Sequence, residues 1–128
     1  MNLNQQRLHV IIADGTLARL DAGDETNAGL LYKILRRKTP SLEMTLHYQR
    51  GIRGTGLKKW LEVAAGIGLN KSICNSYATL ARRYRPGDRI MLFGFSRGAY
   101  AVRSLAGMIG RIGLLHQEHV TSERVLRA

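Results

Sequence analysis

The segment "RIMLFGFSRGAY", residues 89–100, decides which fold the sequence predicts. It opens with a mostly apolar run typical of a buried strand, and from residue 97 onward the apolar positions recur at helical spacing. Between these two patterns stands Ser96, with Gly94 and Gly98 on either side in a G-x-S-x-G motif. Such a motif predicts a tight turn from strand to helix at the carboxyl end of a sheet.

A serine in this turn meets the requirements of a nucleophile, because its hydroxyl is exposed and open to a neighbouring base. Gly94 and Gly98 occupy the positions where a Cβ would clash with the adjacent strand and helix. The turn also directs the backbone N–H of Arg97 toward an oxyanion on the substrate. A serine that only capped the helix would need neither glycine. We therefore predict that Ser96 is a catalytic nucleophile.

The rest of the chain predicts alternating strands and helices within a single domain, residues 1–128. Strands are expected at "LHVII", "EMTLHY" and "RIMLF", which begin at residues 8, 43 and 89. Helices are expected after the cap "TN" at residues 26–27, over residues 69–84 and after Ser96. This order is typical of the α/β class, with parallel strands joined by right-handed crossovers.

The strand order predicted for this sheet is 2-1-3, with the strand at residues 8–12 in the centre. In an open doubly wound sheet, a site lies where successive connections leave the sheet in opposite directions. The loop "ADGT", residues 13–16, would then lie beside Ser96. In this arrangement Gly15 or Thr16 supplies a second oxyanion N–H, and Asp14 orders the loop through hydrogen bonds.

Composition agrees with a globular domain, since 45% of the residues are hydrophobic. The lone Cys74 excludes an internal disulfide and fits a reducing compartment. The apolar runs are far too short for a membrane span, and the first residues lack a secretory signal pattern. We therefore expect a cytoplasmic location and no transmembrane segment.

The net charge of +11, from 20 basic and 9 acidic residues, raises the question of an anionic partner. The basic residues stand in small groups, a pattern typical of solvated helix ends. No aromatic-interleaved basic strand or recognition helix accompanies them, so nucleic-acid binding is not favoured. A basic module that binds nucleic acid or an anionic surface remains the weaker alternative.

The block "RPGDRIMLFGFSRGAYAVRSLAGMIGRIGLL", residues 85–115, resembles the α/β-hydrolase domain of type VI secretion phospholipase effectors. The block is also similar to a domain of unknown function in bacterial proteins. The landmarks "DGT", "TN" and "GIRGTG" extend the resemblance over almost the whole chain. It implies a three-layer hydrolase core and hydrolysis of carboxylic esters, with phospholipids as the substrates of the effector branch. We expect no cofactor or metal, and secretion by a route that needs no signal peptide is the alternative to a cytoplasmic location.

The sequence departs from the family at two points. Leu17 and Ala18 replace an aromatic pair, and the family's domain is considerably longer. The resemblance therefore implies a truncated core, the nucleophile-bearing N-terminal half. In this fold an acid and then a histidine follow the serine.

Four residues after Ser96 have the right types and order to supply this acid and base: His116, Glu118, His119 and Glu123. They follow a helix of about twelve residues, roughly 18 Å long, which carries them away from the serine. His47 lies at the correct end of the sheet but two strands away. The three candidate bases are therefore His47, His116 and His119, and in each case an ordinary surface or strand-end residue is the competing interpretation.

Three other features of the sequence suggest different functions. An aspartyl-phosphate phosphatase needs a second Asp where Thr16 stands, and the phosphate-loop-like "AGIGLNKS", residues 65–72, has Asn70 in place of a required glycine. Trp60 is either a packed loop residue or a membrane-facing lid residue.

The predicted function is that of an ester hydrolase, active as an enzyme if the acid and base are supplied. The competing interpretation is a non-catalytic scaffold or interaction protein. The apolar third strand, at an open sheet edge, predicts a homo-oligomer or a partner chain that covers this edge.

Overall fold

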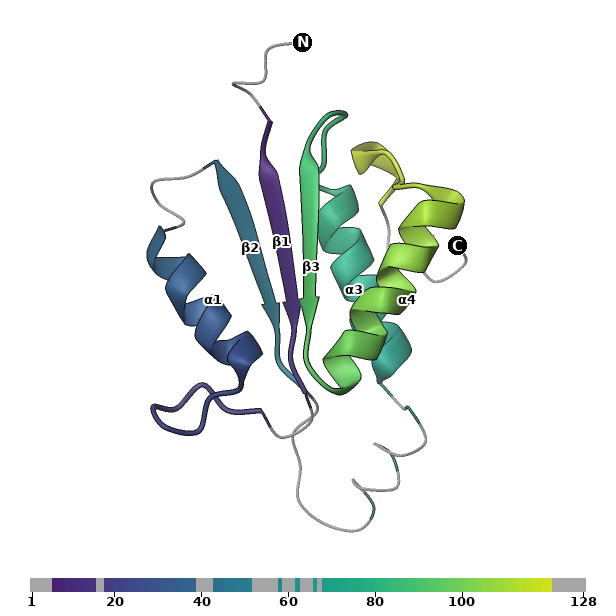
Figure 1. Cartoon of the computed structure of the whole chain (residues 1–128). Coiled ribbons are helices and arrows are strands. Elements are labelled where there is room, and N and C mark those ends of the chain that lie inside the picture. Colours follow the sequence, from purple (N-terminus) through teal and green to yellow (C-terminus); the bar gives the residue numbers. More distant parts are fainter. Residues whose placement is uncertain are drawn as a thin grey trace.

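The computed structural model describes residues 6–15, 18–38, 43–51, 58, 62, 66 and 68–120. Within these residues the strands and helices alternate as the sequence predicts (Figure 1). A short 3-10 turn follows the last helix and was not expected. The elements are β1 (Leu8–Ala13), α1 (Asn27–Lys38), β2 (Met44–Gln49), α3 (Leu69–Ala81), β3 (Arg89–Gly94), α4 (Arg97–Ile112) and the 3-10 turn Gln117–His119.

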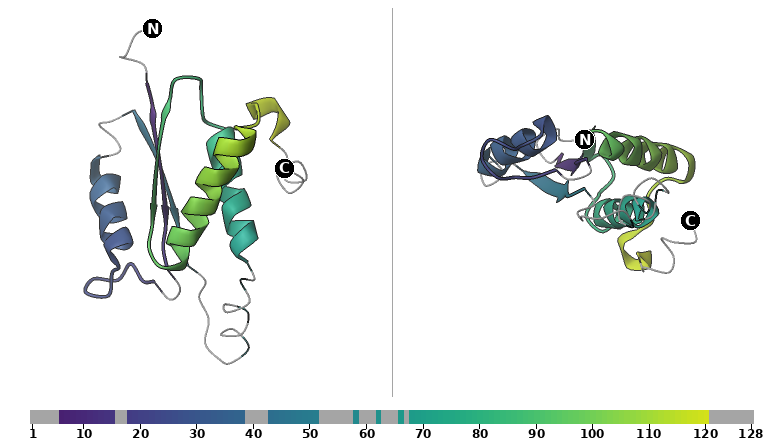
Figure 2. Two further views of the ribbon diagram at one scale, coloured as in Figure 1. Left: turned by 45° about the vertical axis from the view of Figure 1, so that its right-hand side comes forward. Right: turned by 90° about the horizontal axis from the view of Figure 1, so that it is seen from below.

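The three strands form a parallel sheet in the order β2-β1-β3, which confirms the predicted topology. Ala13 at the end of β1 pairs with Gln49 at the end of β2 and with Gly94 at the end of β3. The carboxyl ends of all three strands therefore meet at one edge. Helix α1 covers one face of the sheet, and α3 and α4 cover the other, which gives three layers (Figure 2).

The core lies on both faces of β1, whose side chains alternate between the two helical layers. Val10 and Ile12 belong to a cluster with residues of α1, whereas Ile11 packs with residues of α3 and α4. The largest buried side chain in the described part of the chain is Tyr77 of α3, which is 0% exposed. Its hydroxyl donates to the carbonyl oxygen of Gly113 at 3.0 Å and thereby ties α3 to the end of α4.

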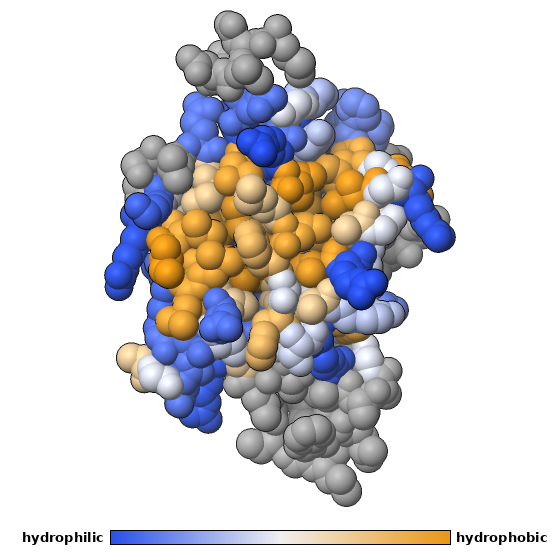
Figure 3. Space-filling view, in the orientation of Figure 1, coloured by the Kyte–Doolittle hydropathy of each residue, from blue (hydrophilic) through white to orange (hydrophobic). Residues whose placement is uncertain are grey.

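The outer edge of β3 pairs with no strand among the described residues. On β3, Met91 and Phe93 are two residues apart and therefore point to the same face of the sheet, where they are 41% and 38% exposed. On α1, Leu30 and Ile34 are exposed as well. Figure 3 shows an apolar area in the middle of the molecule, between α1 and α4 as seen in Figure 1. A large apolar surface of this kind marks an interaction site more often than ordinary protein surface.

Candidate active site

Ser96 stands in the turn between β3 and α4 with φ of 54° and ψ of −122°. It is the one non-glycine residue with positive φ in the part of the chain that the structure describes. This backbone conformation is strained for a residue with a Cβ, and such strain is characteristic of a nucleophile elbow. The side chain is exposed at the carboxyl edge of the sheet.

The two motif glycines permit a close approach of backbone segments that no larger residue would allow. A Cβ on Gly94 would lie 2.5 Å from the Cα of Ala99 in α4. A Cβ on Gly98 would lie only 2.0 Å from the carbonyl oxygen of Ala13 in β1. Both contacts are with backbone, which cannot rotate away as a side chain can. The glycines therefore hold β3, α4 and β1 close together around Ser96.

The loop after β1 lies directly beside Ser96. A Cβ built on Gly15 would be 3.1 Å from the Cβ of Ser96. The ladder between β1 and β3 continues into this region, because the N–H of Phe95 donates to the carbonyl oxygen of Ala13 at 3.0 Å. The strand order 2-1-3 thus brings together two loops that are about eighty residues apart in the sequence.

Backbone donors at this junction differ in their availability. Among the described residues, no acceptor is bonded to the N–H of Arg97, the first residue of α4. The N–H of Gly15 already donates to Oδ1 of Asp14 at 2.7 Å. Thr16 lies outside the described residues. The available N–H closest in sequence to Ser96 is therefore that of Arg97.

Asp14 anchors the loop after β1. Its carboxylate is buried and accepts hydrogen bonds from the hydroxyls of Thr26 and Tyr48 as well as from Gly15. Thr26 in turn caps α1, because its Oγ1 accepts the N–H of Gly29 at 3.0 Å. Burial, together with the hydrogen bond to Asp14, raises the pKa of the Tyr48 hydroxyl, so Tyr48 remains a donor. One carboxylate therefore connects β1, α1 and β2 next to the serine turn.

A family model for the catalytic domain of type VI secretion Tle1-like phospholipase effectors matches residues 7–127. The chain belongs to this family. The Tle1-like chain is also 36% identical over 121 residues to the uncharacterized protein YEL023C of Saccharomyces cerevisiae. That alignment includes 83% of the Tle1-like chain but only 18% of the yeast protein. No solved structure matches the chain.

The three candidate bases of the Tle1-like chain lie away from Ser96. His47 pairs with Ile11 in the middle of β2, and β1 separates β2 from β3. Burial and the positive charge of Arg83 lower the pKa of His47. His116 and His119 are exposed beyond the far end of α4, whose 16 residues span about 24 Å. Glu118 is exposed in the same turn, and Glu123 lies outside the described residues.

A buried histidine that sequence reasoning missed, His9, lies at the opposite end of the sheet. Its Nε2 is 2.9 Å from Oδ2 of Asp88, and its Nδ1 is 2.6 Å from Oγ1 of Thr45. Burial raises the pKa of Asp88, but hydrogen bonds from His9 and two backbone N–H groups outweigh this and lower it overall. His9 precedes Ala13 by four residues, about 13 Å along β1, so this pair cannot serve Ser96. The sequence pattern that indicates a buried histidine here is its position inside the otherwise apolar strand "LHVII".

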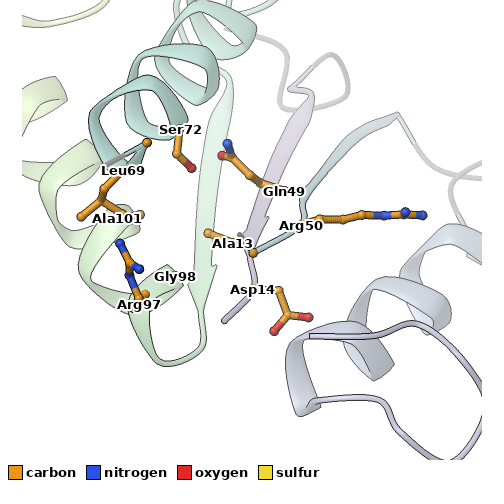
Figure 4. A pocket seen from close by; sticks show the side chains of 11 residues that line it. Ala13, Asp14, Gln49, Arg50, Leu69, Ser72, Arg97, Gly98 and Ala101 are labelled. Atoms are coloured by element: carbon orange, nitrogen blue, oxygen red, sulfur yellow. The ribbon is translucent and has the colours of Figure 1, made fainter. Parts of the chain in front are cut away.

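A small cavity of about 30 Å³ lies beside the elbow, between the carboxyl ends of β1 and β2 and the first turns of α3 and α4 (Figure 4). Arg97, Ser72, Gln49 and Asp14 line it. The described residues contain no group of three or more histidine, cysteine or acidic side chains placed to hold a metal ion. They also contain no helix that combines the length and the apolar character needed to cross a bilayer.

Proposed function

We propose that the Tle1-like domain hydrolyses carboxylic esters of lipids, with Ser96 as the nucleophile. The observation that carries the proposal is the positive φ of Ser96 between two glycines that admit no Cβ. A positive φ costs free energy in a residue with a Cβ, and such strained residues are found mostly at functional sites. Membership of a phospholipase effector family supports a phospholipid ester as the substrate.

In the proposed reaction, Oγ of Ser96 attacks the ester carbonyl carbon while its proton passes to a base. The carbonyl oxygen becomes an oxyanion, which accepts the N–H of Arg97 and a second N–H from the loop after β1. We expect Thr16 to supply this second donor, because Asp14 already accepts the N–H of Gly15. The alcohol then leaves with a proton, and water hydrolyses the acyl-serine.

The acid and base are expected from a segment outside the described residues. Nothing in the described part of the chain places a histidine at the elbow, since His47 is two strands away and His116 and His119 lie beyond α4. Without a base, acylation by an unactivated ester is slow, and the acyl-serine is not turned over efficiently. The proposal therefore predicts trapping of an intermediate rather than rapid catalysis by the 128-residue chain.

Incubation of the chain with a short-chain nitrophenyl ester should acylate Ser96 with slow turnover or none. The activated leaving group compensates in part for the missing base, and the oxyanion donors retain some acceleration. Mass spectrometry of peptides should locate the acyl group on Ser96, and Ser96→Ala should remove it. Ser104→Ala, on the same helix, is the matched control and should leave the labelling unchanged.

Acyl groups found only on lysines, or equal labelling of wild type and Ser96→Ala, would contradict the assignment of Ser96 as the nucleophile. That result would favour a non-catalytic scaffold. Rapid turnover that depends on Ser96 would show instead that a base lies within this chain. His47, His116 and His119 would then be the residues to replace.

The open edge of β3 supports a proposal about assembly: in the purified chain, a second copy covers this edge. No described strand pairs with this edge, and Met91 and Phe93 are exposed next to it; open edges of this kind pair with other chains. Light scattering should therefore show particles larger than one chain at micromolar concentration. Phe93→Lys places a charge on the exposed side of the strand and should shift the population toward monomer. A wild-type monomer at all concentrations would contradict the proposal.

A further inference from the structure

A row of apolar side chains, here called the β3 stripe, follows one face of β3 and ends next to Ser96. Ile90 and Leu92 pack toward α3 and α4 on the opposite face. Because successive side chains of a strand point to opposite faces, the residues between them face the side of the sheet that carries α1. The β3 stripe consists of Met91, Phe93 and Phe95. Each of these side chains is between 38% and 46% exposed, so together they form a continuous apolar surface.

The last member of the β3 stripe, Phe95, connects it to the serine turn. Its N–H donates to the carbonyl oxygen of Ala13 at 3.0 Å, so the ladder with β1 and the alternation of side chains extend to this residue. Its ring lies against the loop after β1, since a Cβ built on Gly15 would be 3.2 Å from Cδ1 of the ring. Ser96 is the next residue. The β3 stripe is therefore continuous with the place where the ester carbonyl is attacked in the proposed reaction.

Helix α1 provides further apolar surface beside the β3 stripe. Tyr32 of α1 stacks on Tyr48 of β2, with ring centroids 4.6 Å apart. Leu30 and Ile34 each lie two residues from Tyr32, about 200° around the helix, and therefore on the flank turned away from β2. Both are exposed, like the β3 stripe. Figure 3 shows apolar surface that extends across the middle of this face of the molecule.

The exposed part of this sheet face is narrow. On β1, Val10 and Ile12 are only 1% and 0% exposed, because they pack with residues of α1. On the other side, β3 is the outermost strand of the described sheet. The exposed surface is therefore about 4.8 Å wide, the spacing of neighbouring strands, whereas a helix with its side chains needs about 10 Å. A single extended alkyl chain matches this width, and a helix would project beyond the sheet edge.

We propose that the β3 stripe binds the acyl chain of the lipid ester that Ser96 attacks. From Met91 to Phe95 the strand advances by about 13 Å. An extended chain of single bonds advances about 1.2 Å per bond, so the β3 stripe accommodates an acyl chain of about ten carbons. The carbonyl end of the acyl chain lies at the serine turn, and its methyl end lies at Met91. The apolar side chains favour methylene groups, which are thereby removed from water.

This assignment rests on the proposed function, because it places the acyl chain relative to Ser96, and it adds a preference for chain length. Pairing of the β3 edge with a second copy would extend the sheet sideways and leave this face open, so the two proposals are compatible. Fatty-acid binding is measurable on a chain without the nucleophile. A failure of Ser96 as nucleophile and a failure of the β3 stripe therefore give different results.

The first measurement is the affinity of the full chain carrying Ser96→Ala for hexanoate and decanoate, each below its micellar concentration, from NMR shifts. The carboxylate is the same in both probes, so its attraction to the positively charged protein cancels in the ratio of the two dissociation constants. Complete burial of one methylene strengthens binding about fourfold, and a surface open on one side covers about half of it, which gives about twofold per carbon. Decanoate should therefore bind roughly tenfold more tightly than hexanoate.

Phe93→Ser, added to this chain, should reduce that ratio to about threefold or less, because the middle of the β3 stripe becomes polar. Met91→Ser should weaken the binding of decanoate more than that of hexanoate, because only the longer chain reaches this end. Ile112→Ser is the matched control. It removes an apolar side chain that is 49% exposed on α4, on the other side of the sheet, and should leave the ratio unchanged. Circular dichroism checks that each variant is folded.

The second measurement compares esters in the chain that retains Ser96. Nitrophenyl decanoate should acylate Ser96 faster than nitrophenyl butyrate, and Phe93→Ser should remove this difference. Equal affinities for the two fatty acids, or an unchanged ratio in the Phe93→Ser chain, would overturn acyl-chain binding and leave the apolar face to a protein partner. Binding that depends on Phe93 without a chain-length effect on acylation would overturn the connection to Ser96. Absence of acylation by both esters would contradict the proposed function, and the fatty-acid affinities would still decide whether the β3 stripe binds an acyl chain.

Discussion

Replacement of Gly98 by alanine is expected to lower the free energy of unfolding by about 4 kcal/mol or more, or to prevent folding. The added Cβ would lie 2.0 Å from the carbonyl oxygen of Ala13 and 2.4 Å from its carbonyl carbon. Both atoms belong to the backbone of the central strand, which is hydrogen-bonded on both sides. Relief requires α4 to move away from β1, which would also open the cluster that contains Ala101 and Val102.

Urea unfolding followed by circular dichroism measures this loss, and Gly107→Ala provides the control on the same helix. A Cβ on Gly107 meets no atom within 4 Å. This substitution should stabilise the chain by roughly 0.5–1 kcal/mol, because alanine is the better helix former. If Gly98→Ala proved as stable as wild type, the close packing of α4 on β1 would be wrong, and with it the structural basis of the elbow.

Replacement of Asp14 by alanine is expected to cost about 3 kcal/mol and to slow acylation of Ser96. The change leaves the hydroxyls of Thr26 and Tyr48 and the N–H of Gly15 without their acceptor. Through these hydrogen bonds Asp14 holds the loop after β1, which lies against Ser96, in place on α1 and β2, so the loop should lose its fixed position. Asp14→Asn keeps one acceptor oxygen and should retain part of the stability.

Asp24→Ala removes the same kind of side chain from an exposed position and should change stability by less than about 0.5 kcal/mol. Urea unfolding gives both stabilities, and the nitrophenyl ester assay gives the acylation rate. An Asp14→Ala chain with wild-type stability would show that Asp14 does not anchor the loop. A destabilised chain with an unchanged acylation rate would show that Asp14 stabilises the fold but does not affect the reactivity of Ser96.

The local elements and the serine turn could be predicted because their signals are local. Apolar spacing distinguished β3 from α4, and the order of strands and helices required a parallel sheet. The two glycines around Ser96 indicated close backbone approaches, which the structure locates at α4 and β1. The boundaries differed by one to a few residues, since helix and strand ends depend on neighbours that lie far away in the sequence.

Other features could not be predicted, because they depend on which segments meet in space. Nothing local to His9 or Asp88 indicated that they form a buried pair across 79 positions of sequence. The N–H of Gly15 donates to the side chain of Asp14, a contact that depends on how this side chain is oriented. We therefore expect Thr16, and not Gly15, to be the second oxyanion donor. The motif shows only an arginine after a serine and does not reveal that the terminal nitrogens of Arg97 are buried without a hydrogen-bond partner in the described part of the chain.

By itself, the sequence determined the α/β class and the position of a serine between two glycines, because spacing and residue size constrain the backbone directly. The strand order was predicted from the topology usual for open doubly wound sheets. Only the tertiary structure decided which groups surround that serine. Gly15 lies against it, whereas His47, His116 and His119 do not, and the buried terminal nitrogens of Arg97 have no hydrogen-bond partner among the described residues. These relations follow from strand order, helix length and packing, which fix distances between residues that are remote along the chain.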